Sequence, residues 1–156
     1  MIKKTLIIIA FFFTAGLFSA NAQSVGELGL RWGNVTGGDF ALDGIVGLGE
    51  FSRIHANVSF GGNGPTDFGI DAIWDFIYRP LGGEAFMWYA GAGPFLGFGD
   101  IFSLGVAGEI GLQYNFQIPL SISLDYRPAF RLVEDTDFDS GGFGLNIRYR
   151  FGGGSK

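Results

Sequence analysis

The stretch "FSLGVAGEIGLQY", Phe102–Tyr114, alternates strictly between two kinds of residue over thirteen positions. Its even-numbered positions are Phe, Leu, Val, Gly, Ile, Leu and Tyr, and its odd-numbered positions are Ser, Gly, Ala, Glu, Gly and Gln. Successive side chains of a β-strand point to opposite faces, whereas the side chains of a helix repeat about every 3.6 residues. The stretch therefore predicts a strand with one apolar face and one face of small or polar residues.

The same alternation recurs along the chain, between turn segments rich in Gly, Asn, Asp and Pro. Ile45, Ile73 and Ile77 interrupt it. Pro94 cannot donate a ladder hydrogen bond, so we expect a bulge or bend there. Evenly spaced strands with no helical pattern between them predict an all-β, antiparallel, up-and-down closed barrel. Its eight expected strands are Leu28–Trp32, Phe40–Leu48, Ile54–Phe60, Phe68–Tyr78, Phe86–Phe98, Phe102–Tyr114, Leu120–Tyr126 and Phe143–Phe151.

The first 22 residues have the pattern of a cleavable secretory signal peptide. "MIKK" is basic, Leu6–Phe18 is an apolar run of thirteen residues, and "ANA" at 20–22 fits the small-x-small cleavage rule. Thirteen apolar residues are fewer than the roughly 20 that a spanning helix needs, so we expect cleavage between Ala22 and Gln23. No cysteine follows that point, which argues against a lipoprotein. The expected organisation is a signal peptide at 1–22, a barrel at 23–151 and a C-terminal extension at 152–156.

The charge and cysteine content of the chain limit the classes of protein to which it can belong. Cleavage would leave 134 residues with eight basic and fifteen acidic side chains, a net charge of −7. An acidic chain without a basic patch is not expected to bind nucleic acid. The chain contains no cysteine, so no disulfide framework holds the fold. Charged residues make up only 16% of the sequence, against about 25% in an ordinary soluble domain.

The size of the apolar side chains indicates which face of the barrel points outward. An eight-stranded interior is barely wide enough to be filled by side chains, so the many rings of the apolar faces cannot lie inside. Many of them fall near strand ends, where aromatic girdles of membrane barrels meet the headgroups. The sequence therefore predicts a transmembrane barrel. The rings expected on its lipid side are Trp32, Phe40, Phe60, Trp74, Phe76, Tyr78, Phe86, Trp88, Phe102, Tyr114, Tyr126, Phe143, Tyr149 and Phe151.

The polar faces are then expected to line the lumen. Because an unpaired buried charge costs several kcal/mol, balanced charges predict a salt-bridged, closed lumen, with a polar pathway or active site as the alternative. Glycines of "YAGAGPFLGFG" would make room for long arginines, and the stretch lacks the strand–loop–helix context of a phosphate loop. The charges expected inside are Glu27, Asp43, Asp67, Asp71, Asp75, Glu109 and Asp125 with Arg31, Arg53, Arg79, Arg127, Arg131, Arg148 and Arg150, and His55 beside them.

Three segments, "WYAGAGPFLGFGD", "GVAGEIGLQYNFQIPLSISLDYRPAF" and "GFGLNIRYRF", resemble small outer-membrane β-barrel proteins of the Bacteroidetes, flavobacteria in particular. More distantly, the chain resembles OmpX- and OmpA-type eight-stranded barrels. The resemblance implies the bacterial outer membrane as location, and its lipids, the barrel assembly machinery and periplasmic chaperones as partners. The last strand resembles the signal that this machinery reads, with Tyr149 and Phe151 at its aromatic places. Asn146 stands where glycine is common, and "GGGSK" continues past the aromatic end.

A hydrolytic triad and a zinc site have weaker support in the sequence. His55 is the only histidine, and a hydrolytic triad with Ser59 or Ser52 is not expected, because four residues along a strand span about 13 Å. One histidine and no cysteine cannot supply a zinc site of those two residue types.

The acidic segment "EDTDFDSGG" is a candidate for weak cation binding through Asp135, Asp137 and Asp139. It is reminiscent of a calcium loop, but Ser140 and Asn146 stand where that loop requires glycine and glutamate. A solvated acidic loop is the simpler interpretation.

We therefore expect a non-enzymatic, monomeric barrel without a cofactor, with both chain ends on the periplasmic side. Its role would be envelope integrity or a small surface contact. An outer-membrane lipid-modifying enzyme and a soluble periplasmic lipid-binding barrel are the alternatives. The extracellular loops, all short, are expected at 34–39, 61–66, 99–101 and 132–142.

Overall fold

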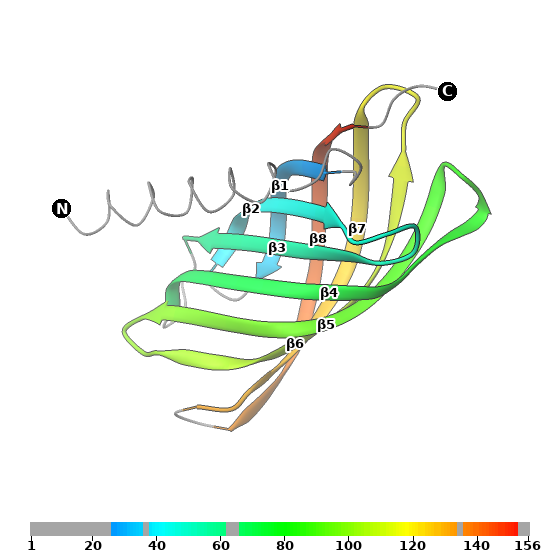
Figure 1. Cartoon of the computed structure of the whole chain (residues 1–156). Coiled ribbons are helices and arrows are strands. Elements are labelled where there is room, and N and C mark those ends of the chain that lie inside the picture. The colour runs from blue at the N-terminus through cyan, green and yellow to red at the C-terminus, as the bar shows by residue number, and fades with distance from the viewer. Residues whose placement is uncertain (1–25, 36–37, 62–65, 134–135, 153–156) are drawn as a thin grey trace.

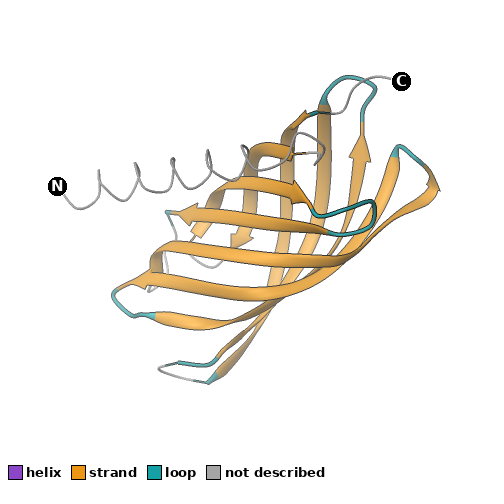
Figure 2. Ribbon diagram, viewed as in Figure 1, coloured by secondary structure: helices purple, strands orange, loops and turns teal. Residues whose placement is uncertain are grey.

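The computed structural model describes residues 26–35, 38–61, 66–133 and 136–152. The described residues form eight antiparallel strands: β1 (Gly26–Val35), β2 (Gly38–Gly47), β3 (Arg53–Phe60), β4 (Thr66–Gly83), β5 (Phe86–Gly99), β6 (Ser103–Asn115), β7 (Leu120–Arg131) and β8 (Asp137–Phe151). Consecutive strands pair, and β8 pairs with β1, so the sheet closes into a barrel (Figure 1). Short turns join β2 to β3, β4 to β5, β5 to β6 and β6 to β7 (Figure 2). The predicted all-β, up-and-down barrel is confirmed; the proposed signal peptide lies outside the described residues.

The first and last strands fix the two rims of the barrel. Gly26 pairs with Phe151, so β1 begins and β8 ends at one rim, which we call the terminal rim. The β2–β3, β4–β5 and β6–β7 turns lie at the same rim. The β5–β6 turn lies at the opposite, distal rim, where β1, β3 and β7 also end. There the expected loop at 132–142 is shorter than predicted, because β8 already begins at Asp137.

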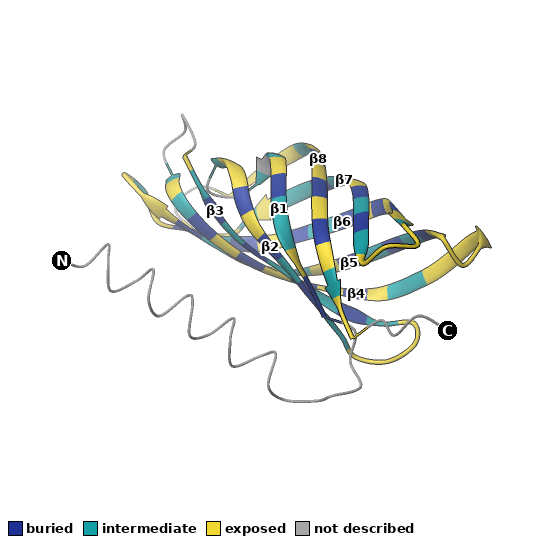
Figure 3. Cartoon of the chain, turned by 90° about the horizontal axis from the view of Figure 1, so that it is seen from above, coloured by how far each residue is buried: buried dark blue, intermediate teal, exposed yellow. Residues whose placement is uncertain are grey.

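Burial alternates along the strands as the period of two requires. In Figure 3 buried and exposed bands follow one another along β1 and β8. On β6, Glu109 is buried inside the barrel and the next residue, Ile110, is 54% exposed on its outer face. On β7, Ser123 and Leu124 repeat this contrast. The apolar faces thus point outward and the polar faces inward, as predicted.

Two of the three isoleucines that interrupt the alternation fill the lumen. Ile45 and Ile73 occupy inward positions and are buried. Ile73 packs against Phe95 and Ala107, and the partly buried Ala129 joins them. These apolar side chains do not break the strand period. They supply an apolar layer within an otherwise polar interior.

Of the bulge or bend expected at Pro94, the bulge is absent, and the bend stays a prediction. Pro94 pairs with Val106 in an unshifted β5–β6 ladder, which accommodates one missing donor without an extra residue. The register of β4 and β5 instead shifts between the pairs Trp74–Ala92 and Ile77–Ala90. The extra residue in β4 exchanges the faces taken by the later residues of that strand, as bulges do.

That shift reverses the expected orientation of Tyr78. Tyr78 pairs with the buried Tyr89, and directly opposed residues share a face of the sheet. Its ring therefore faces the lumen, where the Arg53 guanidinium carbon lies 4.3 Å from the ring centroid. The assignment of Tyr78 to the lipid side is wrong, because the period of two does not survive a bulge.

Inward glycines permit two kinds of close approach. A Cβ on Gly144 would lie 2.2 Å from the Arg31 guanidinium carbon, so this glycine makes room for an arginine as expected. A Cβ on Gly93 would lie 2.0 Å from the carbonyl oxygen of Ala72. At Gly93 the backbones approach more closely than any side chain allows, which suits the tight curvature of a narrow barrel.

Replacing Gly93 by Ala should therefore destabilise the barrel by about 1–3 kcal/mol, the usual cost of overpacking. The matched control is Gly108→Ala, whose Cβ would meet no atom closer than 3.7 Å and should change stability by less than about 0.5 kcal/mol. Equilibrium unfolding in urea, followed by tryptophan fluorescence, measures both. Equal midpoints for the two variants would contradict the close approach at Gly93.

Candidate functional site

The lumen of the barrel holds an ionic network contributed by seven of the described strands. Asp and Glu, Arg and the one histidine of the chain meet there, with their side chains withdrawn from solvent. Within the described part of the chain, the buried ionisable residues of this lumen network are Glu27, Arg31, Asp43, Arg53, His55, Asp71, Asp75, Glu109, Asp125, Arg127 and Arg148.

Four charges that the sequence assigns to the lumen are not among its buried residues, and of these Arg79 alone is turned outward by the β4 bulge. Arg79 is exposed, and its guanidinium stacks 3.5 Å from the ring centroid of Phe51, because the β4 bulge turns it outward. Arg150 donates to the carbonyl oxygen of Phe116 at 3.0 Å, in the β6–β7 turn. Asp67 is exposed and Arg131 is partly exposed near the distal rim. The expected balance of charges is therefore not found: six buried carboxylates of the described residues face four buried guanidiniums and His55.

Arg148 occupies the centre of one half of the network. Its Nε donates to Glu27 at 2.9 Å, and its Nη1 donates to Asp43 at 2.6 Å. Its Nη2 donates to Gln113 at 3.0 Å and to Ser123 at 2.6 Å. Every nitrogen of the guanidinium has an acceptor, so one side chain links β1, β2, β6, β7 and β8 across the interior.

Arg53 lies at the start of β3, on the side of the terminal rim. Its Nε donates to Asp75 at 2.7 Å, and its Nη1 donates to Gln113 at 2.7 Å. The guanidinium carbon lies 4.3 Å from the ring centroids of both Tyr78 and Tyr89. This cation–π sandwich exists because the bulge turns Tyr78 inward.

His55 lies between two carboxylates. Its Nε2 is 2.5 Å from Asp43 and its Nδ1 is 2.7 Å from Glu109. Arg127 covers the ring, with its Nη2 3.1 Å from Nδ1 and 3.3 Å from Nε2. The same arginine donates to Glu109 at 2.7 Å and to Asp71 at 3.0 Å.

Arg31 forms a third group with Asp125 and Asn146. Its Nη1 donates to Asp125 and, at 3.2 Å, to the side-chain oxygen of Asn146. Asp125 also accepts from the Asn146 amide at 2.7 Å and from the Tyr89 hydroxyl at 3.0 Å. The neutral partners of the network, such as Gln113, Asn146 and Tyr89, were not singled out from the sequence. Their place on the inward face of an expected strand was the available signal.

The contacts of His55 do not favour a hydrolytic triad. Both ring nitrogens contact carboxylates, and the Ser52 hydroxyl instead accepts from the indole nitrogen of Trp74 at 2.7 Å. Ser59 is buried on the same face of β3 as His55, four residues further along the strand. The carboxylates and Arg127 hold the imidazole as a partner in a charge network, not as a base beside a serine.

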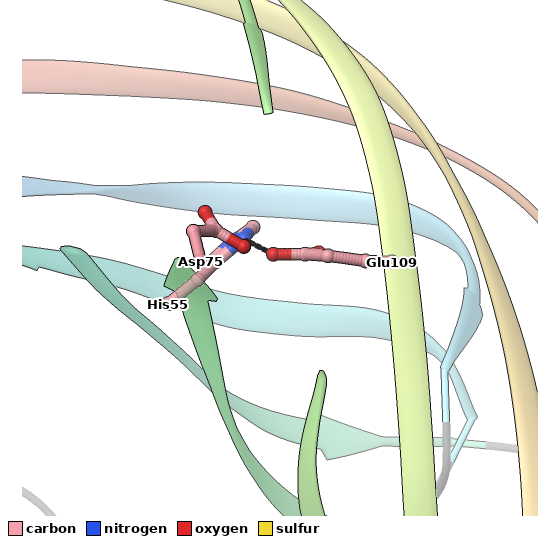
Figure 4. Close-up of side chains that lie close together, drawn as sticks. All are labelled: His55, Asp75 and Glu109. Carbon is pink, nitrogen blue, oxygen red and sulfur yellow. Dashed lines mark hydrogen bonds and ion pairs between the residues drawn. The ribbon is translucent and has the colours of Figure 1, made fainter. Parts of the chain in front are cut away.

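The acidic segment proposed for cation binding is only partly described. Asp135 lies outside the described residues. Asp137 opposes Arg131 at the start of β8, and Asp139 accepts from the backbone N–H of Gly141 at 2.8 Å. Among the described residues, the group whose ligand atoms converge is instead His55, Asp75 and Glu109 (Figure 4).

The terminal aromatics Tyr149 and Phe151 are exposed on β8, with ring centroids 4.9 Å apart. Their exposure leaves both rings accessible at the terminal rim. Their role in assembly stays a prediction.

Comparison of the sequence with protein-family models and with curated proteins gave no match. The described part of the chain has no helix with the length and apolar character needed to cross a membrane.

Replacing Arg148 by Met should destabilise the barrel by about 3–5 kcal/mol, because it leaves Glu27 and Asp43 buried without their main cation. Arg150→Met is the matched control, since Arg150 lies on the same strand but binds a turn carbonyl, and about 1 kcal/mol is expected. Urea unfolding of the two variants gives the comparison. If both variants unfold at the same urea concentration, the network does not stabilise the fold as argued.

Proposed function

We propose that this protein is a non-enzymatic transmembrane barrel of the bacterial outer membrane, with a closed lumen and a structural role in the envelope. One observation carries the proposal: the outer surface of the barrel is apolar, while its interior is ionic. A water-soluble barrel has the opposite arrangement. The resemblance of the sequence to small Bacteroidetes outer-membrane barrels supports the particular membrane.

The outward side chains of neighbouring strands form a continuous apolar surface. Soluble monomers rarely expose apolar patches larger than a few hundred Å², whereas here large apolar side chains are exposed on every strand except β3 among those described. Lipid is the environment in which such a surface is stable. The exposed set on mid-strand positions includes Leu42, Ile70, Trp74, Val106, Ile110, Leu112, Leu124, Leu145 and Ile147.

Aromatic rings gather near both rims. Near the distal rim, neighbouring ring centroids lie 5.5–6.0 Å apart in the pairs Phe60–Phe68, Phe68–Phe98 and Phe98–Phe102. Near the terminal rim, Phe86 and Tyr114 lie 6.4 Å apart. Rings at two levels correspond to the girdles that membrane barrels place at the two headgroup regions.

The filled interior favours a structural role over transport or catalysis. Arg53 and its two tyrosines occupy the lumen toward one rim, and Ile73, Phe95 and Ala107 form the apolar layer further along. An eight-stranded barrel has no room for an aqueous channel beside such side chains. With a short β5–β6 turn at the distal rim, a role in envelope integrity or a small surface contact fits best.

The folded protein should be recovered with the outer membrane and need detergent for extraction. On a gel it should migrate faster unheated than after boiling, because a barrel closed by β1–β8 pairing has no free edge from which to unravel. Membrane fractionation with heated and unheated samples tests both expectations. A protein that purifies from the periplasm without detergent would refute the membrane proposal.

Replacing Ile110 by Arg should cost about 2–4 kcal/mol if this mid-strand position contacts the bilayer core. Leu48→Arg is the matched control, because Leu48 lies in the β2–β3 turn and is 58% exposed, close to the 54% of Ile110. Unfolding of both variants refolded into lipid vesicles measures the difference. Similar small costs at the two positions would indicate that water, not lipid, surrounds β6.

A further inference from the structure

Three metal-ligating side chains meet inside the barrel from strands that are not all neighbours. His55 reaches the lumen from β3, Asp75 from β4 and Glu109 from β6 (Figure 4). One ligand atom of each lies within 4.8 Å of the others, and all three residues are buried. We call these three residues the His55 cluster. The proposed structural function gives these three residues no specific role.

Each of the two carboxylates accepts from an arginine through one oxygen and directs its other oxygen into the cluster. Asp75 Oδ2 accepts from Arg53 Nε at 2.7 Å, while Asp75 Oδ1 is buried and receives no hydrogen bond from a protein donor. The Asp75 and Glu109 carboxyl groups lie within hydrogen-bonding reach of each other, a contact that needs a shared proton when no cation is bound. Glu109 Oε2 accepts from Arg127 Nε at 2.7 Å, and Glu109 Oε1 faces the His55 ring. A buried oxygen without a partner is rare in native proteins and calls for a ligand or a proton.

His55 is oriented as a metal-binding histidine is. Its Nε2 is 2.5 Å from Asp43 Oδ1, and Asp43 is itself held by Arg148 at 2.6 Å. A carboxylate on the far nitrogen fixes the tautomer and ring orientation of ligating histidines in metal sites generally. With the Nε2 proton directed at Asp43, the 2.7 Å hydrogen bond between Nδ1 and Glu109 Oε1 needs a second proton when no cation is bound. A cation would take the place of that proton on Nδ1.

The excess of buried negative charge over buried positive charge favours a divalent cation. In the described lumen network, six carboxylates face four guanidiniums. With a neutral His55, two positive charges are missing, and an uncompensated buried charge is strongly unfavourable. One divalent cation bound by the neutral imidazole would make the network neutral.

We propose that the His55 cluster binds a divalent transition-metal cation through His55 Nδ1, one oxygen of Asp75 and Glu109 Oε1. Imidazole with carboxylates is a ligand set that Zn²⁺ accepts. Ligand atoms at about 2.0–2.2 Å from zinc lie roughly 3–4 Å apart, so small side-chain shifts separate the cluster from a coordination shell. The cation would replace the direct contact of His55 with Glu109 and link β3, β4 and β6 inside the barrel.

Arg127 is the contact that opposes binding. Its Nη2 lies 3.1 Å from His55 Nδ1, where it would repel a cation. Its Nη2 also lies 2.7 Å from Glu109 Oε2, and its other donors bind Glu109 and Asp71, so a bound cation requires the whole guanidinium to shift away from the ring. This repulsion should lower the affinity of the His55 cluster for a cation.

The test uses the purified, folded full barrel, freed of metal with a chelator, incubated with Zn²⁺ and exchanged into buffer. Elemental analysis should find one zinc per chain. Zinc should also raise the midpoint of thermal unfolding, and the chelator should reverse that rise, because a ligand that binds only the folded state stabilises it. Absence of zinc from the folded wild-type protein would overturn the proposal and leave protons to neutralise the carboxylates. Heat-dependent gel migration tests the membrane barrel separately.

Asp75→Asn keeps the size of the side chain and removes one ligand charge, and it should weaken zinc binding by at least about 10-fold. Glu27→Gln is the matched control: it removes one carboxylate from the same lumen, but Glu27 binds Arg148, Gln113 and Ser121, away from the cluster. The control should lose much less affinity than Asp75→Asn, because it removes a charge of the lumen but no ligand. Glu109→Gln serves in place of Asp75→Asn if that variant does not fold. An equal loss in ligand and control variants would show that bulk charge, not coordination, attracts zinc, and would refute the site.

Discussion

The need to pair every charge in a narrow interior governs this structure. A closed barrel of this size has a lumen that side chains alone fill, and here the side chains are largely ionic. Arg148 and Arg127 each contact carboxylates from different strands. Removal of one partner leaves the other charge buried without a counter-charge, which is strongly unfavourable. The network therefore holds the strands together from inside. It replaces the apolar core that a soluble domain of this length would need.

The outer surface is a consequence of the same arrangement. Strand side chains alternate, so a lumen that takes the polar residues of β1–β8 leaves the apolar residues outside. The result is a surface rich in leucine, isoleucine and aromatic rings, with rings paired near both rims. A soluble lipid-binding barrel would require those faces inside, where the lumen network already lies. The two faces together therefore favour the proposed transmembrane barrel over a soluble carrier.

The charges of the lumen network are not equally well paired in all its parts. Around Arg148, every guanidinium nitrogen has an acceptor, as a purely structural network requires. Around His55, two carboxylates converge on one imidazole, and an oxygen of Asp75 receives no hydrogen bond from a protein donor. This excess of negative charge distinguishes the His55 cluster from its surroundings and is the physical basis of the proposed cation site. A catalytic use of His55 finds no comparable support, since its nitrogens contact carboxylates and not a nucleophile.

The sequence alone determined the strands, their order and, outside the β4 bulge, the face that most residues take, because a period of two is a local property of an extended chain. It also placed residues such as Glu27, Asp43 and Arg148 in the lumen. Only the tertiary structure decided the partners: Arg31 meets Asp125 across 94 positions of chain, and His55 meets Glu109 across 54. The register shift in β4, which turns Tyr78 inward and Arg79 outward, was not predicted. Ile77, which interrupts the alternation directly after the shift, was its one sign, but Ile45 and Ile73 interrupt it without a bulge, so the sign was ambiguous. Pairing depends on register and closure, which are set by all the strands together.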